Sequence, residues 1–167
     1  MSADTSSTGR TSGRTSAREI KGIAGLEALV GEHLGYSEYI EITQERVNQF
    51  ADATGDHQWI HVDPVRAKDG PFGGTIAHGY LTLAIGPLLA PQICYVSGIS
   101  MGVNYGCGKV RFPSPVPVGS KLRLGMEVLT VETISPGQAQ ATYRYMFEVE
   151  GAPKPSCVAE VIVRLYE

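Results

Sequence analysis

A carboxylate and an imidazole five residues apart are the side chains of this sequence best suited to chemistry. Asp56 and His61 lie in the segment FADATGDHQWIH, and a His78-Gly79 pair follows the glycine-rich stretch after it. A carboxylate beside an imidazole can pass a proton to and from a water molecule. The free backbone N–H groups at the start of a helix can polarise a carbonyl oxygen. Together these groups suit the addition of water to an activated double bond.

The flanking elements predict that both groups lie at helix ends. A helix is expected to begin at Thr43 and to bury an apolar face made of Val47, Phe50, Ala51 and Thr54. Gly55 favours a left-handed helix terminus, which places Asp56 in the loop just beyond. Residues 77–93 are apolar nearly all round, although Gly86-Pro87 interrupts them, so we expect this second helix to be enclosed by other structure.

The remaining periodicity predicts an α+β fold. Residues 22–34 carry apolar side chains at helical spacing, and a short strand is expected over 36–42. Four longer stretches rich in Val, Tyr, Thr and Ile are typical of strands: 99–112, 121–132, 138–150 and 156–166. Several long antiparallel strands and one apolar helix indicate an antiparallel sheet wrapped around a central buried helix. In the last strand, the apolar and polar residues alternate too unevenly to identify the buried face.

Composition narrows the class of protein. The 167 residues are 43% hydrophobic and 19% charged, which is typical of one soluble domain, and the net charge of −3 without a dense basic stripe argues against nucleic acid. Three widely spaced cysteines indicate neither a disulfide framework nor a zinc site. The longest apolar run is too short to span a membrane. Residues 1–18 predict a disordered tail before a domain over 19–167, and we expect a cytoplasmic protein.

Three segments carry a resemblance to a known family: TGDHQWIHVDP (54–64), GPFGGTIAHGYLTLAIGPLL (70–89) and NYGCGKVRFPSPVPVGSKLR (104–123). The chain resembles the MaoC-like dehydratases, the (R)-specific enoyl-CoA hydratases of single hotdog fold. It resembles in particular the subgroup that includes nodulation protein N-like sequences and a mycobacterial 3-hydroxyacyl-thioester dehydratase. The family pattern has Asn-Pro where this chain has Gln58-Trp59, a variant associated with that subgroup.

The resemblance implies a thioester of coenzyme A or acyl carrier protein as substrate, a homodimer, and catalysis by Asp56 and His61 without cofactor or metal. Asp56 is expected to activate the water and His61 to orient it and protonate C2, although the two roles can be shared or reversed. Gly79 is expected to supply the oxyanion site, because its missing side chain lets a thioester approach the backbone N–H. Gln58 is a candidate contact for the water or the substrate amide.

Two further residue predictions concern the neighbourhood of this pair. Lys109 and Arg111 are candidate contacts for the phosphates of coenzyme A. His78 is expected to be structural rather than catalytic.

Two other classes of function remain as alternatives. The spacing of His57 and His61, with His78 as a third ligand, is close to the HExxH zinc signature, but Gln58 replaces the glutamate that acts as base there. Gly55 and Pro64 also argue against a regular helix over this segment. The second alternative is a hotdog acyl-thioester hydrolase or a non-catalytic binding protein of the same fold. The Asp56 and His61 pair favours hydration, because hydrolases of this fold generally use a lone carboxylate.

Overall fold

The fold is built on a six-stranded sheet. The computed structural model describes residues 17–167. The strand order is β2-β6-β7-β8-β5, and β3 also pairs with β6. All pairs in this sheet are antiparallel. The bounds are β2 His33–Tyr36, β3 Ile40–Glu41, β5 Met101–Arg111, β6 Lys121–Ser135, β7 Gln138–Val149 and β8 Cys157–Tyr166. The four long strands confirm those predicted from composition, and β5 forms one edge of the sheet.

Side chains alternate across the long strands as the two-residue repeat of a strand requires. In β7 the buried residues are Ala139, Ala141, Tyr143, Tyr145 and Phe147. In β8 they are Cys157, Ala159, Val161 and Leu165. The inward face of β8 is apolar throughout and includes the partly exposed Val163. The uneven alternation arises because the other face carries Val158 and Ile162 beside charged residues. One face of the sheet therefore carries the core.

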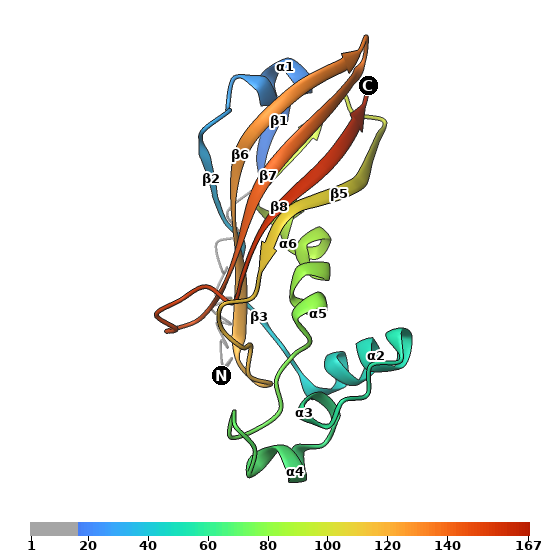
Figure 1. Cartoon of the computed structure of the whole chain (residues 1–167). Coiled ribbons are helices and arrows are strands. Elements are labelled where there is room, and N and C mark those ends of the chain that lie inside the picture. The colour runs from blue at the N-terminus through green and yellow to red at the C-terminus, as the bar shows by residue number, and fades with distance from the viewer. Residues whose placement is uncertain (1–16) are drawn as a thin grey trace, which may run out of the picture.

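Two helices lie in line along that face, α5 Gly79–Ala84 and α6 Gly86–Ile93 (Figure 1). Their buried residues include Leu81, Leu89 and Ile93. The predicted central helix is therefore present, with His78 and Gly79 at its start as expected, but it divides before Gly86-Pro87. Full enclosure was a wrong expectation for the single chain, because Tyr80 is 74% exposed and Leu88 is 50% exposed. No other element of residues 17–167 covers this side.

The N-terminal region differs most from the sequence-based expectation. The strand β1 (Arg18–Lys21) pairs in parallel with β4 (Cys94–Ser97), so Arg18, which was assigned to the tail, takes part in the fold. The rest of the predicted tail, apart from Ala17, lies outside the described residues. The helix α1 covers only Gly22–Glu27. A helix reaching residue 34 was a wrong prediction, because Gly31 is left-handed with φ of 85° and the chain turns there into β2.

The expected strand over 36–42 is likewise two short strands, β2 and β3, each paired with β6. Beyond one end of the sheet lie three helices, α2 Gln44–Thr54, α3 Trp59–Val62 and α4 Pro64–Lys68 (Figure 1). Thr43 caps α2 by accepting a hydrogen bond from the backbone N–H of Arg46, as predicted. Within residues 17–167, every helix is too short or too polar to cross a membrane.

Candidate active site

The loop that carries Asp56 begins where α2 ends. Gly55 is the C-cap of α2, with φ of 79°, and its N–H donates to the carbonyl of Ala51. A residue with a Cβ adopts this left-handed conformation at a cost, so glycine here sets the direction in which the chain leaves the helix. Asp56 follows at once and is exposed. This confirms the predicted position of the carboxylate.

His61 lies in the short helix α3 and is held from two sides. Its side chain is 7% exposed, and Nδ1 lies 2.7 Å from the carbonyl oxygen of Ile76. Because a carbonyl can only accept, Nδ1 carries the proton of this hydrogen bond. The backbone carbonyl of His61 accepts from Nε2 of Gln44, also at 2.7 Å. Because Nδ1 carries the proton, neutral His61 has its lone pair on Nε2.

Burial also sets the charge state of this imidazole. Desolvation lowers the pKa of His61 below the ordinary value, and the neighbouring His78 adds to this lowering. The bond to the Ile76 carbonyl and the charge of Asp56 act in the opposite direction. The net lowering of the pKa favours a neutral imidazole near pH 7, which is the form that can accept a proton.

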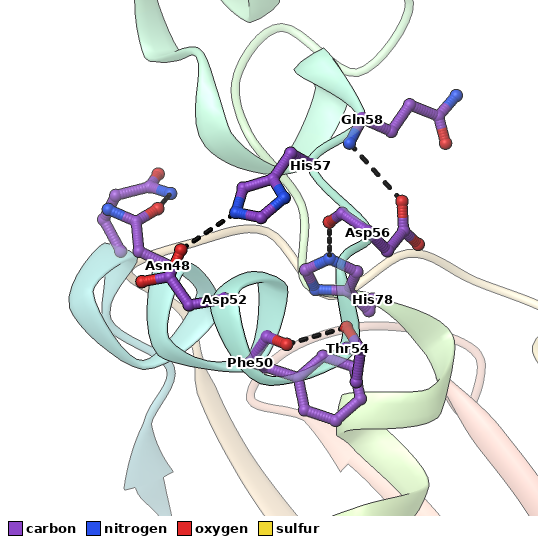
Figure 2. A network of polar contacts seen from close by, with 9 residues as sticks. Asn48, Phe50, Asp52, Thr54, Asp56, His57, Gln58 and His78 are labelled. Carbon is purple, nitrogen blue, oxygen red and sulfur yellow. Dashed lines mark hydrogen bonds and ion pairs between the residues drawn. The ribbon is translucent and has the colours of Figure 1, made fainter.

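His78 joins the two catalytic candidates from a third segment. It is the N-cap residue of α5 and only 2% exposed. Its Nε2 lies 2.9 Å from the backbone carbonyl oxygen of Asp56, and its ring stacks on that of His61 with centroids 3.9 Å apart. Figure 2 shows His78 on one side of the Asp56 backbone while the carboxylate extends on the other. One ligand-type atom from each of Asp56, His61 and His78 lies within 4.8 Å of the others.

A cavity of about 250 Å³ opens in front of His61. Gly79 lines it beside His61, and the ring of Phe112 lies directly against the Cα of this glycine. A Cβ added at Gly79 would approach that ring to 3.1 Å. The other lining residues are Phe72, Ile76, Ala77, Thr82, Pro113, Ser114, Pro115, Val116 and Ser156. The lining of the cavity is mainly apolar, and it includes the His61 imidazole and Gly79, the first residue of α5.

Other predicted site residues lie apart from this centre. The backbone N–H of Gln58 donates to Oδ1 of Asp56 at 3.4 Å, but the Gln58 side chain is exposed and points away (Figure 2). Lys109 and Arg111 are exposed on the edge strand β5. Arg111 directly precedes Phe112 and so lies near the cavity, whereas Lys109 lies further along the strand. Their binding roles stay predictions.

The zinc alternative fits the geometry poorly. His57 lies outside α3, and its Nε2 faces Oδ1 of Asp52 at 2.9 Å rather than His61 (Figure 2). The trio that does come together is Asp56, His61 and His78. The two imidazole rings in it are stacked with planes inclined by only 27°, so their lone pairs lie in two nearly parallel planes, one above the other. Ligands of one metal ion must instead converge on a point.

Several contributors could not be found from the sequence. Gln44 holds the His61 backbone, and its Oε1 accepts from the hydroxyl of Thr75 at 2.6 Å. Ile76 acts through its carbonyl, which every residue possesses, and Phe112 reaches Gly79 from the end of β5. None of these positions carries a residue type that signals its contact. No residue pattern predicts the hydrogen bond from His78 to the Asp56 carbonyl either, because the two residues are 22 positions apart.

Comparison with known proteins gives consistent results. A family model described as a MaoC like domain matches residues 26–146. The 3-hydroxyacyl-thioester dehydratase Z of Mycobacterium tuberculosis is 56% identical over 147 residues, which cover 88% of this chain and 97% of that protein. Nodulation protein N of Rhizobium meliloti is 43% identical over 148 residues, covering 84% of this chain and 88% of the relative.

Solved structures share the fold. The unliganded R-hydratase PhaJ1 from Pseudomonas aeruginosa superimposes with a TM-score of 0.65 and 26% identity, covering 87% of this chain and 86% of that one. A monoamine oxidase regulatory protein from Archaeoglobus has a TM-score of 0.76 at 22% identity, covering 91% and 98% of the two chains. The predicted α+β architecture, with an antiparallel sheet around a central helix, is thereby confirmed.

Proposed function

Because the chain belongs to the MaoC-like dehydratase family, we propose that it hydrates trans-2-enoyl thioesters to (R)-3-hydroxyacyl thioesters and catalyses the reverse dehydration. The observation that carries the proposal is the approach of Asp56 to His61, whose imidazole lines a mainly apolar cavity. A relative with 56% identity over nearly its whole length bears the name of a 3-hydroxyacyl-thioester dehydratase. The protein is accordingly a hydro-lyase.

A water held between Asp56 and His61 is the reacting molecule. A gap of up to 4.8 Å between two polar atoms accommodates one water, at a hydrogen bond of about 2.8 Å to each. The carboxylate accepts one hydrogen of this water and Nε2 of neutral His61 accepts the other. The lone pair that attacks C3 of the substrate is then aimed away from both groups.

The hydrogen-bonded tautomer of His61 favours the reverse of the expected roles, with His61 rather than Asp56 as the base. His61 takes a proton from the water as its oxygen bonds to C3, and the resulting imidazolium returns that proton to C2. Asp56 stays ionised, orients the water and stabilises the imidazolium. One water is thus added and both side chains return to their starting states. Because one imidazole serves both carbons, the addition is syn.

The negative charge that passes through the thioester oxygen needs its own donors. The first N–H groups of α5 have no carbonyl partner within the helix, and Gly79 provides one of them beside His61. Phe112 limits the space above this N–H and forms a flat apolar wall for the acyl group. Polar contacts are thereby confined to the thioester end of the substrate.

The carrier and the assembly are extensions of the same proposal. We propose an acyl thioester of coenzyme A or acyl carrier protein as substrate, with Arg111 and then Lys109 as the candidate phosphate contacts. A homodimer formed through β5 is proposed because this edge strand leaves its hydrogen-bonding groups open and carries exposed Val103 and Tyr105. A cytoplasmic location stays a prediction.

The decisive experiment follows crotonyl-CoA. Hydration removes the conjugated absorbance without releasing free thiol, and chiral analysis of the product should give the (R) alcohol. Thiol release at the rate of absorbance loss would identify a hotdog thioester hydrolase instead. Binding without either change would identify a non-catalytic member of the fold.

A further inference from the structure

We propose that His78 is a positioning residue, which holds Asp56 through its backbone and His61 through its ring. This inference rests on the proposed function, because it assigns a further role within the same site. His78 comes from α5, Asp56 from the loop after α2, and His61 from α3. No other contact described above joins the Asp56 backbone to the helix that carries Gly79.

The first contact fixes the loop. Nε2 of His78 lies 2.9 Å from the backbone carbonyl oxygen of Asp56, so Nε2 donates and the carbonyl accepts. Among residues 17–167, the Asp56 side chain has a single hydrogen bond, a long one of 3.4 Å from the N–H of Gln58. An exposed loop without the His78 bond would let the carboxylate change its distance from His61. Errors of about 1 Å in such a position cost on the order of 10²-fold in rate.

The second contact fixes the plane of the base. The His78 ring stacks on the His61 ring at 3.9 Å, and Phe50 packs on His78 with ring centroids 5.0 Å apart. His61 is therefore held by the Ile76 carbonyl at Nδ1 and by an aromatic face along its side. Both restraints leave Nε2 of His61 as the free atom.

The same bond also ties Asp56 to the helix start that carries Gly79. The carbonyl of His78 accepts from the N–H of Thr82 and from its hydroxyl, so the residue is locked into the first turn of α5. A displacement of that turn therefore moves the support of the carboxylate together with the N–H of Gly79. The imidazole thus couples the water-binding group to the proposed oxyanion donor.

The two histidines are expected to carry their protons on different ring nitrogens, and this difference can be measured without an activity assay. His61 must carry its proton on Nδ1 and His78 on Nε2 when both are neutral, because each donates to a carbonyl. The Nδ1 atom of His78 is buried and has no partner within residues 17–167, which agrees with an unprotonated nitrogen. Long-range ¹H–¹⁵N NMR of the wild-type protein distinguishes the two tautomers.

Two substitutions separate the donor from the ring. His78→Phe keeps an aromatic face for His61 but removes the donor, whereas His78→Gln keeps an amide N–H near Nε2 and removes the ring. We expect His78→Phe to lower kcat on crotonyl-CoA at least about tenfold with KM changed less than about twofold. We expect His78→Gln to recover part of the kcat lost in His78→Phe, with the remaining loss due to the missing ring face. His57→Gln is the matched control on the same loop, because His57 is exposed and faces only Asp52.

The outcomes are distinct. Unchanged kcat in His78→Phe would overturn the hold on Asp56, and full recovery of kcat in His78→Gln would overturn the hold on His61. If His78→Phe does not fold, the wild-type NMR spectrum still decides, since an Nδ1–H tautomer at His78 excludes the bond to Asp56. Failure of the proposed function is recognised separately, by a folded wild-type protein that does not hydrate any enoyl thioester while showing the expected tautomers.

Discussion

At the residue scale, Asp56 and His61 differ sharply in environment although the proposed mechanism assigns one water to both. Asp56 is exposed and His61 is buried, and each is held by a backbone carbonyl: Asp56 through its own, which accepts from His78, and His61 through that of Ile76. In the proposed mechanism, the buried imidazole transfers the proton and the exposed carboxylate orients the water. The predictions at this scale test that division.

Removing either member of the pair should stop most of the turnover. We expect Asp56→Asn and His61→Gln each to lower kcat at least about 10²-fold, because one loses the ionised acceptor and the other the base. The double variant should be little slower than the slower single variant, since both act on one water. Crotonyl-CoA kinetics measure this, with circular dichroism as a check on folding. Losses that multiply would mean that the two groups act independently.

The pH dependence should report His61. Burial lowers its pKa below about 6.5, so more than half of the side chain is neutral at pH 6.5. Hydration requires this neutral form, so kcat/KM should rise with pH through the lowered pKa of His61 and then become level. A profile from about pH 4.5 to 8 measures it. An acidic limb with its midpoint above 6.5 would contradict the assignment of His61 as base.

Gly79 should be intolerant of any side chain. A Cβ there meets the Phe112 ring at 3.1 Å, and Val also covers the backbone N–H, so we expect Gly79→Val to lower kcat by about 10²-fold or more. Gly74→Ala is a matched control in the same glycine-rich stretch, because its Cβ would meet nothing within 4 Å. Folding is checked by circular dichroism. A folded Gly79→Val variant with unchanged kcat would mean that the thioester binds elsewhere.

At the element scale, the end of α2 determines where the carboxylate lies. Gly55→Ala puts a Cβ on a residue with φ of 79°, which should cost about 1 kcal/mol of unfolding free energy and shift Asp56. We expect both a lower denaturation midpoint and a lower kcat. Gly151→Ala is matched to it, because φ is 74° and the site is a hairpin turn far along the chain.

The comparison separates strain from function. Gly151→Ala should lose similar stability while keeping wild-type kcat, because the turn between β7 and β8 does not carry Asp56 or His61. Chemical denaturation and crotonyl-CoA kinetics on both variants provide the test. If both variants lose kcat equally, the loss reflects general destabilisation and α2 has no special influence on the loop.

At the scale of the whole molecule, one side of the single chain is left open. Exposed apolar residues lie along β5 and on the outer side of α5 and α6: Tyr80, Leu88, Met101, Val103 and Tyr105. A largely apolar cavity of about 850 Å³ lies between these helices and the strands β5 and β8. Exposed apolar surface of this extent beside an open strand edge is typical of an interface.

We therefore expect a homodimer in which β5 pairs with its copy. Val103→Glu should place like charges near the two-fold axis and shift the protein towards monomer. Light scattering at micromolar concentration, together with the hydration rate, measures this. A wild-type monomer that hydrates crotonyl-CoA at full rate would overturn the dimer, and unchanged assembly in Val103→Glu would place the interface elsewhere.

Local patterns in the sequence determined a large share of this protein. The caps at Thr43 and Gly55, the loop position of Asp56 and the four long strands follow from nearest-neighbour chemistry, so they could be read without a fold. The family resemblance singled out Asp56 and His61 as the pair. Predictions failed where a stripe of apolar residues was longer than the helix that it marked, as between Glu27 and Leu34, because strand pairing with β6 overrode the periodicity.

Only the tertiary structure decided how the chemical groups meet. The protonated nitrogen of His61 depends on the Ile76 carbonyl, and the support of Asp56 depends on His78, contacts that span 15 and 22 residues. Every residue has a backbone carbonyl, so no sequence motif predicts these hydrogen bonds. Phe112 likewise reaches Gly79 only because the edge strand β5 ends beside the start of α5. The packing of the chain therefore determines which nitrogen of His61 is protonated, how Asp56 is supported and what surrounds the proposed catalytic pair.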